Sequence, residues 1–179
     1  YLGQALQTVN PPNASVGTAQ LADSSVTSAK LASGAVANTP AFEAYLGSDQ
    51  TVTSGTTTKI TMNTETFDSA GAYDNSSNYR FTPQTAGKYY VYATVRGSTS
   101  NSGLEIQMAA IYKNGSTYIE NQIDFRNNNA SLMGATVVAI VDMNGSSDYL
   151  ECYGRCLGGT TIKASPTRSS IFGAYKIIE

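Results

Sequence analysis

The side chains that most often carry out catalysis are scarce in this sequence of 179 residues. It contains no histidine, which excludes Ser-His-Asp and Cys-His catalytic sets and histidine-ligated metals. A glycosidase needs two acids about 5 to 10 Å apart, and two pairs could supply them, Glu65 with Asp68 and Glu120 with Asp124. Both pairs fall at positions that alternate toward solvent in predicted strands. We therefore expect no catalytic site and no enzyme activity.

The two cysteines, Cys152 and Cys156, lie four residues apart. In an extended strand their Cα atoms are about 13 Å apart, too far for a disulfide, and two thiols alone make a poor zinc site. We predict reduced thiols in the core, on the face of Leu150, which favours assembly in the cytoplasm over a disulfide-stapled secreted protein. No cofactor or metal is predicted. Calcium is the alternative, with oxygen ligands available from Asp74, Asn75, Asp124, Asn127, Asn128 and Asn129.

The composition favours strands and turns and argues against two classes of partner. Charged residues make up 13% of the chain, against about 25% in an average soluble domain, and Ser, Thr, Asn, Gln and Gly replace them. The 11 Lys and Arg residues are scattered and the isoelectric point is near 5.1, so neither nucleic acid nor an anionic membrane is expected. No apolar run approaches the roughly 20 residues that cross a bilayer. The first residue, Tyr1, indicates a processed product or a fragment.

Residues 1–39 contain a ten-residue repeat, in which residues 15–24 align with residues 25–34. A spacing of five between large apolar residues matches neither a strand nor a helix. A lone chain would bury too little of this segment, whereas several parallel chains could bury its apolar residues together. We predict a shaft segment; the alternative is a disordered linker. The repeated apolar residues are Val16, Leu21, Val26, Leu31 and Val36.

Residues 40–179 show the alternation of an all-β domain. Tyr89, Val91, Ala93 and Val95 alternate with polar or tyrosine residues, and Asn114-Gly115 is a typical hairpin turn. Residues 132–143 are apolar at successive positions, which predicts a strand covered on both faces. Several short strands at this spacing indicate one antiparallel sandwich.

Four sets of residues carry a resemblance to a known fold. The chain opens this region with Pro40-Ala41-Phe42-Glu43-Ala44-Tyr45-Leu46, continues with Phe81, Gly87 and Tyr89 at a fixed spacing, and passes through Asp148-Tyr149-Leu150 to close with Ser170-Ile171-Phe172-Gly173-Ala174-Tyr175. The region resembles the globular head of complement C1q and the related tumour-necrosis-factor-like jelly rolls. The resemblance implies a C1q-like antiparallel jelly roll that forms a three-fold homotrimer.

The repeat before residue 40 is in turn similar to the shafts of bacteriophage tail fibres. Together the two resemblances imply a homotrimeric virion fibre, tail or head, whose tip acts outside the cell and binds a host-surface receptor, a glycan or a protein. Its other partners would be virion structural proteins. One alternative is a structural decoration fibre or cell-surface filament tip whose head only trimerises. A third hypothesis is a secreted signalling ligand of the tumour-necrosis-factor type.

Counting loops back from the last strand predicts where a receptor would bind. Residues 158–169, 127–130 and 97–103 should lie at the end away from the shaft, and residues 144–147 and 114–116 at the shaft end. The receptor-binding candidates are Asn101, Ser102, Asn127, Asn128, Asn129, Lys163 and Arg168, whose side chains suit sugar hydroxyls or acidic sugars; solvated turns are the alternative. Tyr90 and Tyr92, opposite the core-facing Tyr89, are predicted at the trimer interface, with exposed sheet surface or a ligand platform as alternatives.

Overall fold

The computed structural model describes residues 38–100, 103–164 and 168–177, and before them only residues 12, 13, 16, 17, 19, 21, 26 and 30. The chain divides into two units, Tyr1–Ala37 and Asn38–Glu179; the second is called the head. The boundary predicted from the sequence lies two residues further along the chain. In the described part of the chain, no helix has the length and hydrophobicity of a membrane span.

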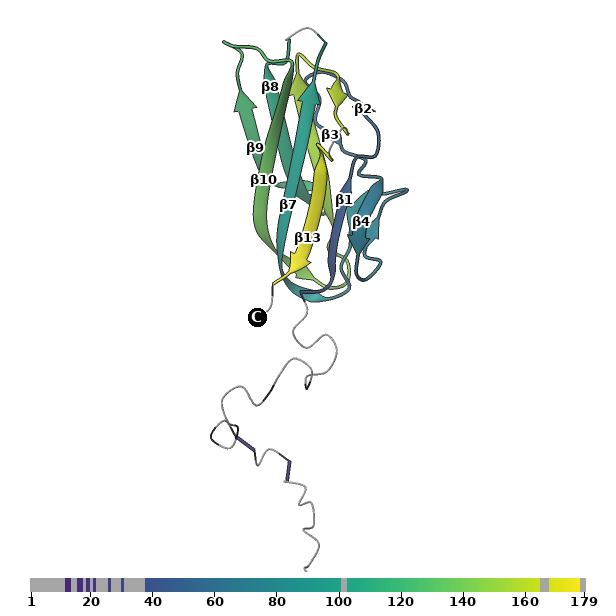
Figure 1. The fold of residues 1–179 in the computed structure, drawn as a ribbon, viewed down its shortest axis with the longest axis vertical. Coiled ribbons are helices and arrows are strands. Elements are labelled where there is room, and N and C mark those ends of the chain that lie inside the picture. Colours follow the sequence, from purple (N-terminus) through teal and green to yellow (C-terminus); the bar gives the residue numbers. More distant parts are fainter. Residues whose placement is uncertain are drawn as a thin grey trace, which may run out of the picture. The chain divides into compact units, whose positions relative to one another are not determined.

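The head is a sandwich of two antiparallel sheets (Figure 1), which confirms the predicted all-β jelly roll. In the first sheet, called sheet A, β7 pairs with β10 on one side and with β13 on the other, and β1 and β4 follow β13. Its strands are β1 (Ala41–Tyr45), β2 (Gln50–Thr51), β4 (Thr64–Asp68), β7 (Ala86–Ser98), β10 (Leu132–Asn144), β12 (Thr161–Ile162) and β13 (Ile171–Lys176). Sheet B contains β3 (Thr58–Lys59), β5 (Tyr73–Asp74), β6 (Arg80–Phe81), β8 (Ile106–Lys113), β9 (Ser116–Asp124) and β11 (Leu150–Leu157).

Aromatic rings hold the two sheets together near the first strand. The Phe42 ring of β1 stacks on Tyr73 and on Phe81 of sheet B, with 4.5 Å between ring centroids in each pair. Phe172 of β13 meets the Phe42 ring edge-on at 5.1 Å. Residues from the opening and closing segments of the head thus bury one another.

Both cysteines lie inside this core. Cys152 and Cys156 are free and buried on β11, on the same face as Leu150, as predicted. Burial raises the pKa of the Cys156 thiol to about 11 and that of Cys152 further, because an apolar surrounding penalises the thiolate. Both thiols are therefore inert packing groups at neutral pH.

Two turns show why their residue types are needed. Gly87 has a φ of 139°, which leads the chain from buried Phe81 to buried Tyr89. The Tyr89 hydroxyl donates to the Thr85 carbonyl at 2.8 Å and fixes the turn. Asn114 and Gly115 have φ values of 53° and 78°, the positive pair that a two-residue hairpin between β8 and β9 requires.

Strand β10 differs from its prediction. Ala135, Val137 and Val141 point into the core, but Val138 and Ile140 are 47% and 56% exposed. Within a single chain the strand is covered on one face only, so the prediction of two covered faces is wrong for the single chain. Its outer edge lies beside β9, which supplies two side-chain donors to the edge carbonyls: the Tyr118 hydroxyl bonds Ile140 O at 3.0 Å and the Asn121 amide bonds Thr136 O at 2.8 Å.

Candidate functional site

The loops of the head gather at two opposite ends of the sandwich. The end where β1 begins and β13 ends is called the proximal end, and the opposite end is called the distal end; they are the lower and upper ends of the head in Figure 1. The loops predicted to lie together do so at the distal end. Thr99 N donates to Ser131 O at 2.9 Å, and Glu105 N donates to Leu157 O at 2.8 Å. For the described residues, the predicted alternation of loops between the two ends of the head is confirmed.

The distal turn after β9 carries three consecutive asparagines. Asn127, Asn128 and Asn129 are exposed, and their side chains have no hydrogen-bond partner among the described residues. Asn128 N donates to Phe125 O at 2.8 Å, which fixes the backbone of the turn and leaves the side-chain amides available. Asn101 and Ser102, from the neighbouring loop, lie outside the described residues.

The charged candidates are engaged within the chain. The Lys163 ammonium forms an ion pair with Asp49 and donates a hydrogen bond to it. That hydrogen bond, together with one from Ala164 N, lowers the pKa of Asp49. Arg168 has a φ of 52° and places its guanidinium 4.9 Å from the centre of the Tyr45 ring. It also lies 3.8 Å from the Glu43 carboxylate. The structure therefore brings Arg168 onto the outer side of sheet A and does not group it with the asparagines.

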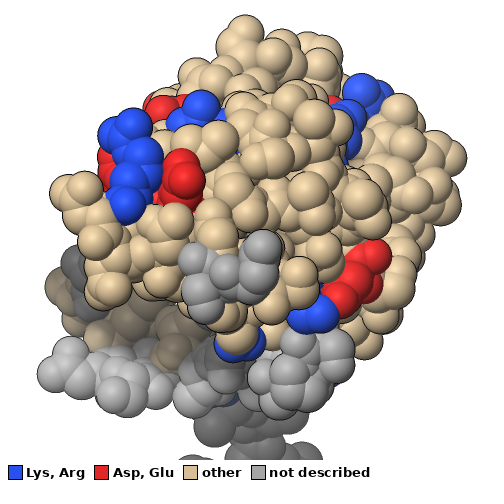
Figure 2. Space-filling view, turned by 90° about the horizontal axis from the view of Figure 1, so that it is seen from above, with Lys and Arg blue, Asp and Glu red and all other residues tan. Residues whose placement is uncertain are grey.

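Seen from above, the distal end is mostly uncharged (Figure 2). Most of the Lys and Arg side chains visible there adjoin Asp or Glu side chains. After β9, Arg126 pairs with Asp124 at 2.5 Å, and the arginine lowers the pKa of that aspartate. Hydrogen-bonding groups, rather than net charge, are what this end offers to a partner.

Tyr90 and Tyr92 lie on the outward face of sheet A, as predicted. The Tyr90 ring lies 6.2 Å from that of Tyr92 and 5.3 Å from that of Tyr175, measured between centroids. In the strand register, Tyr90 is opposite both Ile140 and Tyr175, and Tyr92 is opposite Val138. We call this surface the tyrosine face: Tyr90, Tyr92, Val138, Ile140 and Tyr175. Val138, Ile140 and Tyr175 were not predicted for this surface, although the apolar residues on both faces of residues 132–143 were a signal for the first two.

A glycine sets the position of the Tyr92 ring in the tyrosine face. A Cβ on Gly173 would lie 2.4 Å from the Tyr92 ring, so the missing side chain lets Tyr92 lie across β13. The Tyr92 hydroxyl thereby reaches β1 and donates to the Glu43 carboxylate at 2.8 Å. Burial, and then this carboxylate, raise the pKa of Tyr92. The phenol stays protonated and bridges three strands.

Of the five apolar residues predicted to make contacts in the shaft, the structure describes three. Val16, Leu21 and Val26 are exposed in the single chain. Leu31 and Val36 lie outside the described residues.

The acidic residues considered for catalysis or calcium differ from one another in burial and in hydrogen bonding. Burial, and then the neighbouring Asp68, raise the pKa of Glu65, while Glu120 is exposed on β9. The Asp74 carboxylate accepts hydrogen bonds from the backbone N–H groups of Ser76, Ser77 and Asn78, which lower its pKa. Among the described residues, no group of three His, Cys, Asp or Glu side chains is placed to hold a metal ion.

The arrangement of strands is that of the tumour-necrosis-factor and C1q jelly rolls. The head is similar to Eiger TNF from S. frugiperda, with a TM-score of 0.58 and 11% identity over 78% of this chain and 91% of that one. It is similar to the globular domain of zebrafish complement 1qA protein, with a TM-score of 0.55 and 11% identity over 78% of this chain and 98% of the other. It is also similar to murine APRIL, with a TM-score of 0.58 and 9% identity over 76% of this chain and 98% of the other. No family model matches the sequence, and no curated protein gives a significant match.

Proposed function

We propose that the protein is the tip of a homotrimeric virion fibre, of the bacteriophage type, that binds a receptor on the host-cell surface. In this proposal three heads pack together through the tyrosine face, and the distal loops meet the receptor. The observation that carries the proposal is the exposure of Val138, Ile140 and Tyr175 on a sheet whose other face packs against the core.

The tyrosine face has the chemistry of a protein interface. Tyrosines and aliphatic side chains meet there without a lysine or arginine among them, and contiguous exposed surfaces of this kind usually find a protein partner. A second copy of the chain is the partner that is present wherever the protein is. The exposed Val16, Leu21 and Val26 support the same conclusion, since association would bury them as well.

The distal end supports recognition by hydrogen bonds. The amides of Asn127, Asn128 and Asn129 can each donate and accept, which suits sugar hydroxyls and the polar groups of a protein receptor. Three such turns on a trimer would give avidity from weak single contacts. We propose binding without cleavage, because the sequence has no histidine.

The second candidate function is structural. Lys163 and Arg168 are both engaged within the chain, which favours a head that trimerises and does not recognise a cell. A trimer that binds no cells would support this candidate.

Replacing Asn127, Asn128 and Asn129 together by alanine tests the receptor surface. We expect cell binding to be lost while the thermal midpoint stays unchanged, because these side chains support no described contact. Binding of labelled protein to host cells and thermal unfolding measure the two effects.

The matched control lies at the proximal end, where Ser116 and Thr117 are also exposed on the same strand, β9. Alanine at both positions should leave cell binding intact. Asn114 is unsuitable as a control because its side chain bonds both Asp148 and Tyr149 N. Loss of binding in the control, with full binding in the triple variant, would move the receptor surface to the proximal end.

A further inference from the structure

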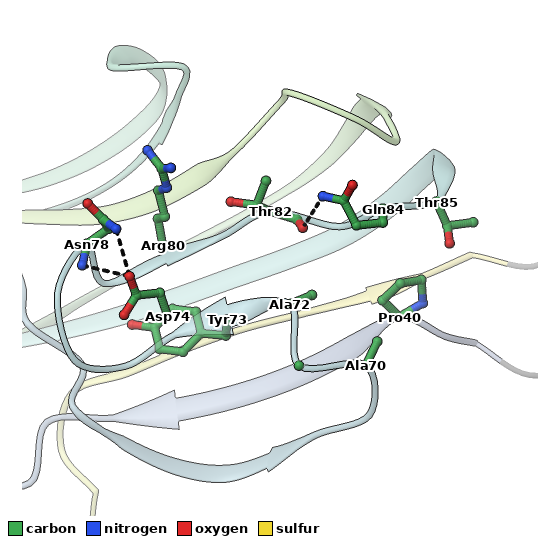
Figure 3. Close-up of a pocket in the computed structure, with 11 residues that line it drawn as sticks. Pro40, Ala70, Ala72, Tyr73, Asp74, Asn78, Arg80, Thr82, Gln84 and Thr85 are labelled. Carbon is green, nitrogen blue, oxygen red and sulfur yellow. Dashed lines mark hydrogen bonds between the residues drawn. The ribbon is translucent and has the colours of Figure 1, made fainter.

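A cleft opens at the proximal end of the head, on the side away from the distal loops (Figure 3). It encloses about 400 Å³. One wall is formed by the turn before β5, with Ala70 and Ala72, together with Pro40. The opposite wall is the segment from β6 to β7, with Thr82 and Gln84. The volume lies within the range of small-molecule sites, about 300 to 1,000 Å³.

The two walls differ in chemistry. The turn presents methyl groups and the proline ring, whereas the opposite wall presents hydroxyl and amide groups. The Gln84 amide donates to Thr82 O at 3.2 Å, and its carbonyl oxygen has no partner among the described residues. The Thr85 backbone carbonyl is occupied by Tyr89, but the Thr85 side chain is exposed. A ligand with an apolar side and a hydroxyl-bearing side would match both walls.

The two charged residues that line the cleft, Asp74 and Arg80, offset each other. Asp74 is held as an anion by the N–H groups of its own turn. Arg80 is its cross-strand neighbour and lies 4.6 Å over the Tyr149 ring. Among the described residues, Arg80 has no carboxylate within ion-pair distance. One fixed anion beside one fixed cation gives neither an anionic nor a cationic ligand a net electrostatic advantage.

We propose that this cleft is a binding site for a neutral pyranose sugar. The sugar ring lies with its C–H side against Ala70, Ala72 and Pro40, and its hydroxyls bond Gln84, Thr85 and Thr82. The site goes beyond the proposed receptor function, because it uses no residue of the distal loops and does not require three chains.

Titration of the isotope-labelled protein with methyl galactoside, N-acetylglucosamine and glucuronate tests the proposal by amide chemical shifts. We expect at least one of the two neutral sugars to shift the resonances of residues 70–74 and 80–85, with an affinity of about millimolar for so small a ligand. Ala70→Leu narrows the cleft, and Gln84→Ala removes a hydrogen-bonding group. Each should weaken binding about tenfold or more.

The alanine variant of Asn127, Asn128 and Asn129 is the control and should bind the sugar as the wild type does. No shift with either neutral sugar, shifts confined to the distal loops, or shifts with glucuronate alone would each overturn the proposal. Host-cell binding by Ala70→Leu is scored separately. If Ala70→Leu loses sugar binding but keeps cell binding, the result supports the cleft as a sugar site and leaves the proposed receptor function intact. If only the asparagine variant loses cell binding, the result concerns the receptor function and not the cleft.

Discussion

The outward faces of the two sheets differ in how far their own side chains cover them. On sheet B, long side chains cover the strands: the Arg155 guanidinium bonds Gln122 on either side of Met108, which is only 2% exposed. Next to them, Tyr112 stacks on Tyr153 at 3.9 Å. On sheet A, the tyrosine face is left open. The difference agrees with the proposed trimer, in which a second chain would cover the tyrosine face of sheet A.

Both outward faces also carry ion pairs. Lys59 pairs with the buried Glu151 at 2.5 Å on sheet B, and Lys88 pairs with Asp142 at 2.7 Å on sheet A, next to the tyrosine face. The tyrosine face itself carries apolar and aromatic groups. Apolar surface gains free energy when another surface covers it, while a satisfied ion pair gains little.

A charge placed in the tyrosine face should have the largest effect. Wild-type protein is expected to give a mass of three times 18.9 kDa by light scattering. Ile140→Glu should reduce the mass to that of one chain, because association would bury an unpaired carboxylate. Ile140 is 56% exposed in the single chain, so the head itself should still fold.

Placing the same charge on sheet B tests whether sheet A is the associating face. Thr117→Glu on β9 should leave the mass unchanged. A wild-type monomer at micromolar concentration, or dissociation by Thr117→Glu but not by Ile140→Glu, would show that sheet A is not the associating face.

A smaller effect is expected from adding a methyl group to sheet A. Gly173→Ala places its Cβ where the Tyr92 ring lies, and the ring must move away from Glu43. Overpacking of this kind costs about 1 to 3 kcal/mol, measured by urea unfolding. Gly134→Ala is the matched control, because no atom lies within 4 Å of the added Cβ; its effect should stay within about 0.5 kcal/mol. Equal effects of the two substitutions would argue against the role given to Gly173.

The smallest expected effect is a difference in acid response between the sheets. Asp148, beside β11, accepts bonds from Asn114 and Lys113, which lower its pKa. Its contribution to stability is present above the pKa of the unfolded chain, about 3.9, and is lost as the pH falls through the lower folded value. The urea midpoint should therefore fall between pH 5 and pH 3, and less steeply in Asp148→Asn.

Glu65, on β4 of sheet A, has the opposite sign. Its pKa is raised, so protonation with falling pH favours the folded state. Glu65→Gln should make the acid decline steeper. A flatter decline in Glu65→Gln than in Asp148→Asn would contradict the assignment.

Local patterns were enough to predict much of the fold. Alternation around Tyr89, the glycine at position 87 and the Asn114-Gly115 turn each depend on neighbours in the sequence, and the structure has them as predicted. The order of loops followed from antiparallel strands alone. These features need only the chain's own stereochemistry and a period of two.

The parts that were missed depend on pairing between distant residues. Tyr92 crosses β13 at Gly173, about 80 positions along the chain, to reach Glu43. Nothing beside Tyr92 in the sequence specifies that register. Arg168 folds back over Tyr45 for the same kind of reason. The proximal cleft is formed by turn residues whose types are ordinary, so only their placement reveals it.

The two side chains that bond the edge of β10 affect how the protein can aggregate. An unpaired strand edge can recruit a strand from another molecule and so begin a fibril. Here the Tyr118 hydroxyl and the Asn121 amide already occupy the carbonyls of Ile140 and Thr136, so an incoming strand would have to displace them. The long edge of sheet A is thereby a poor template for open-ended growth, and heads crowded together at high concentration can remain in solution without polymerising.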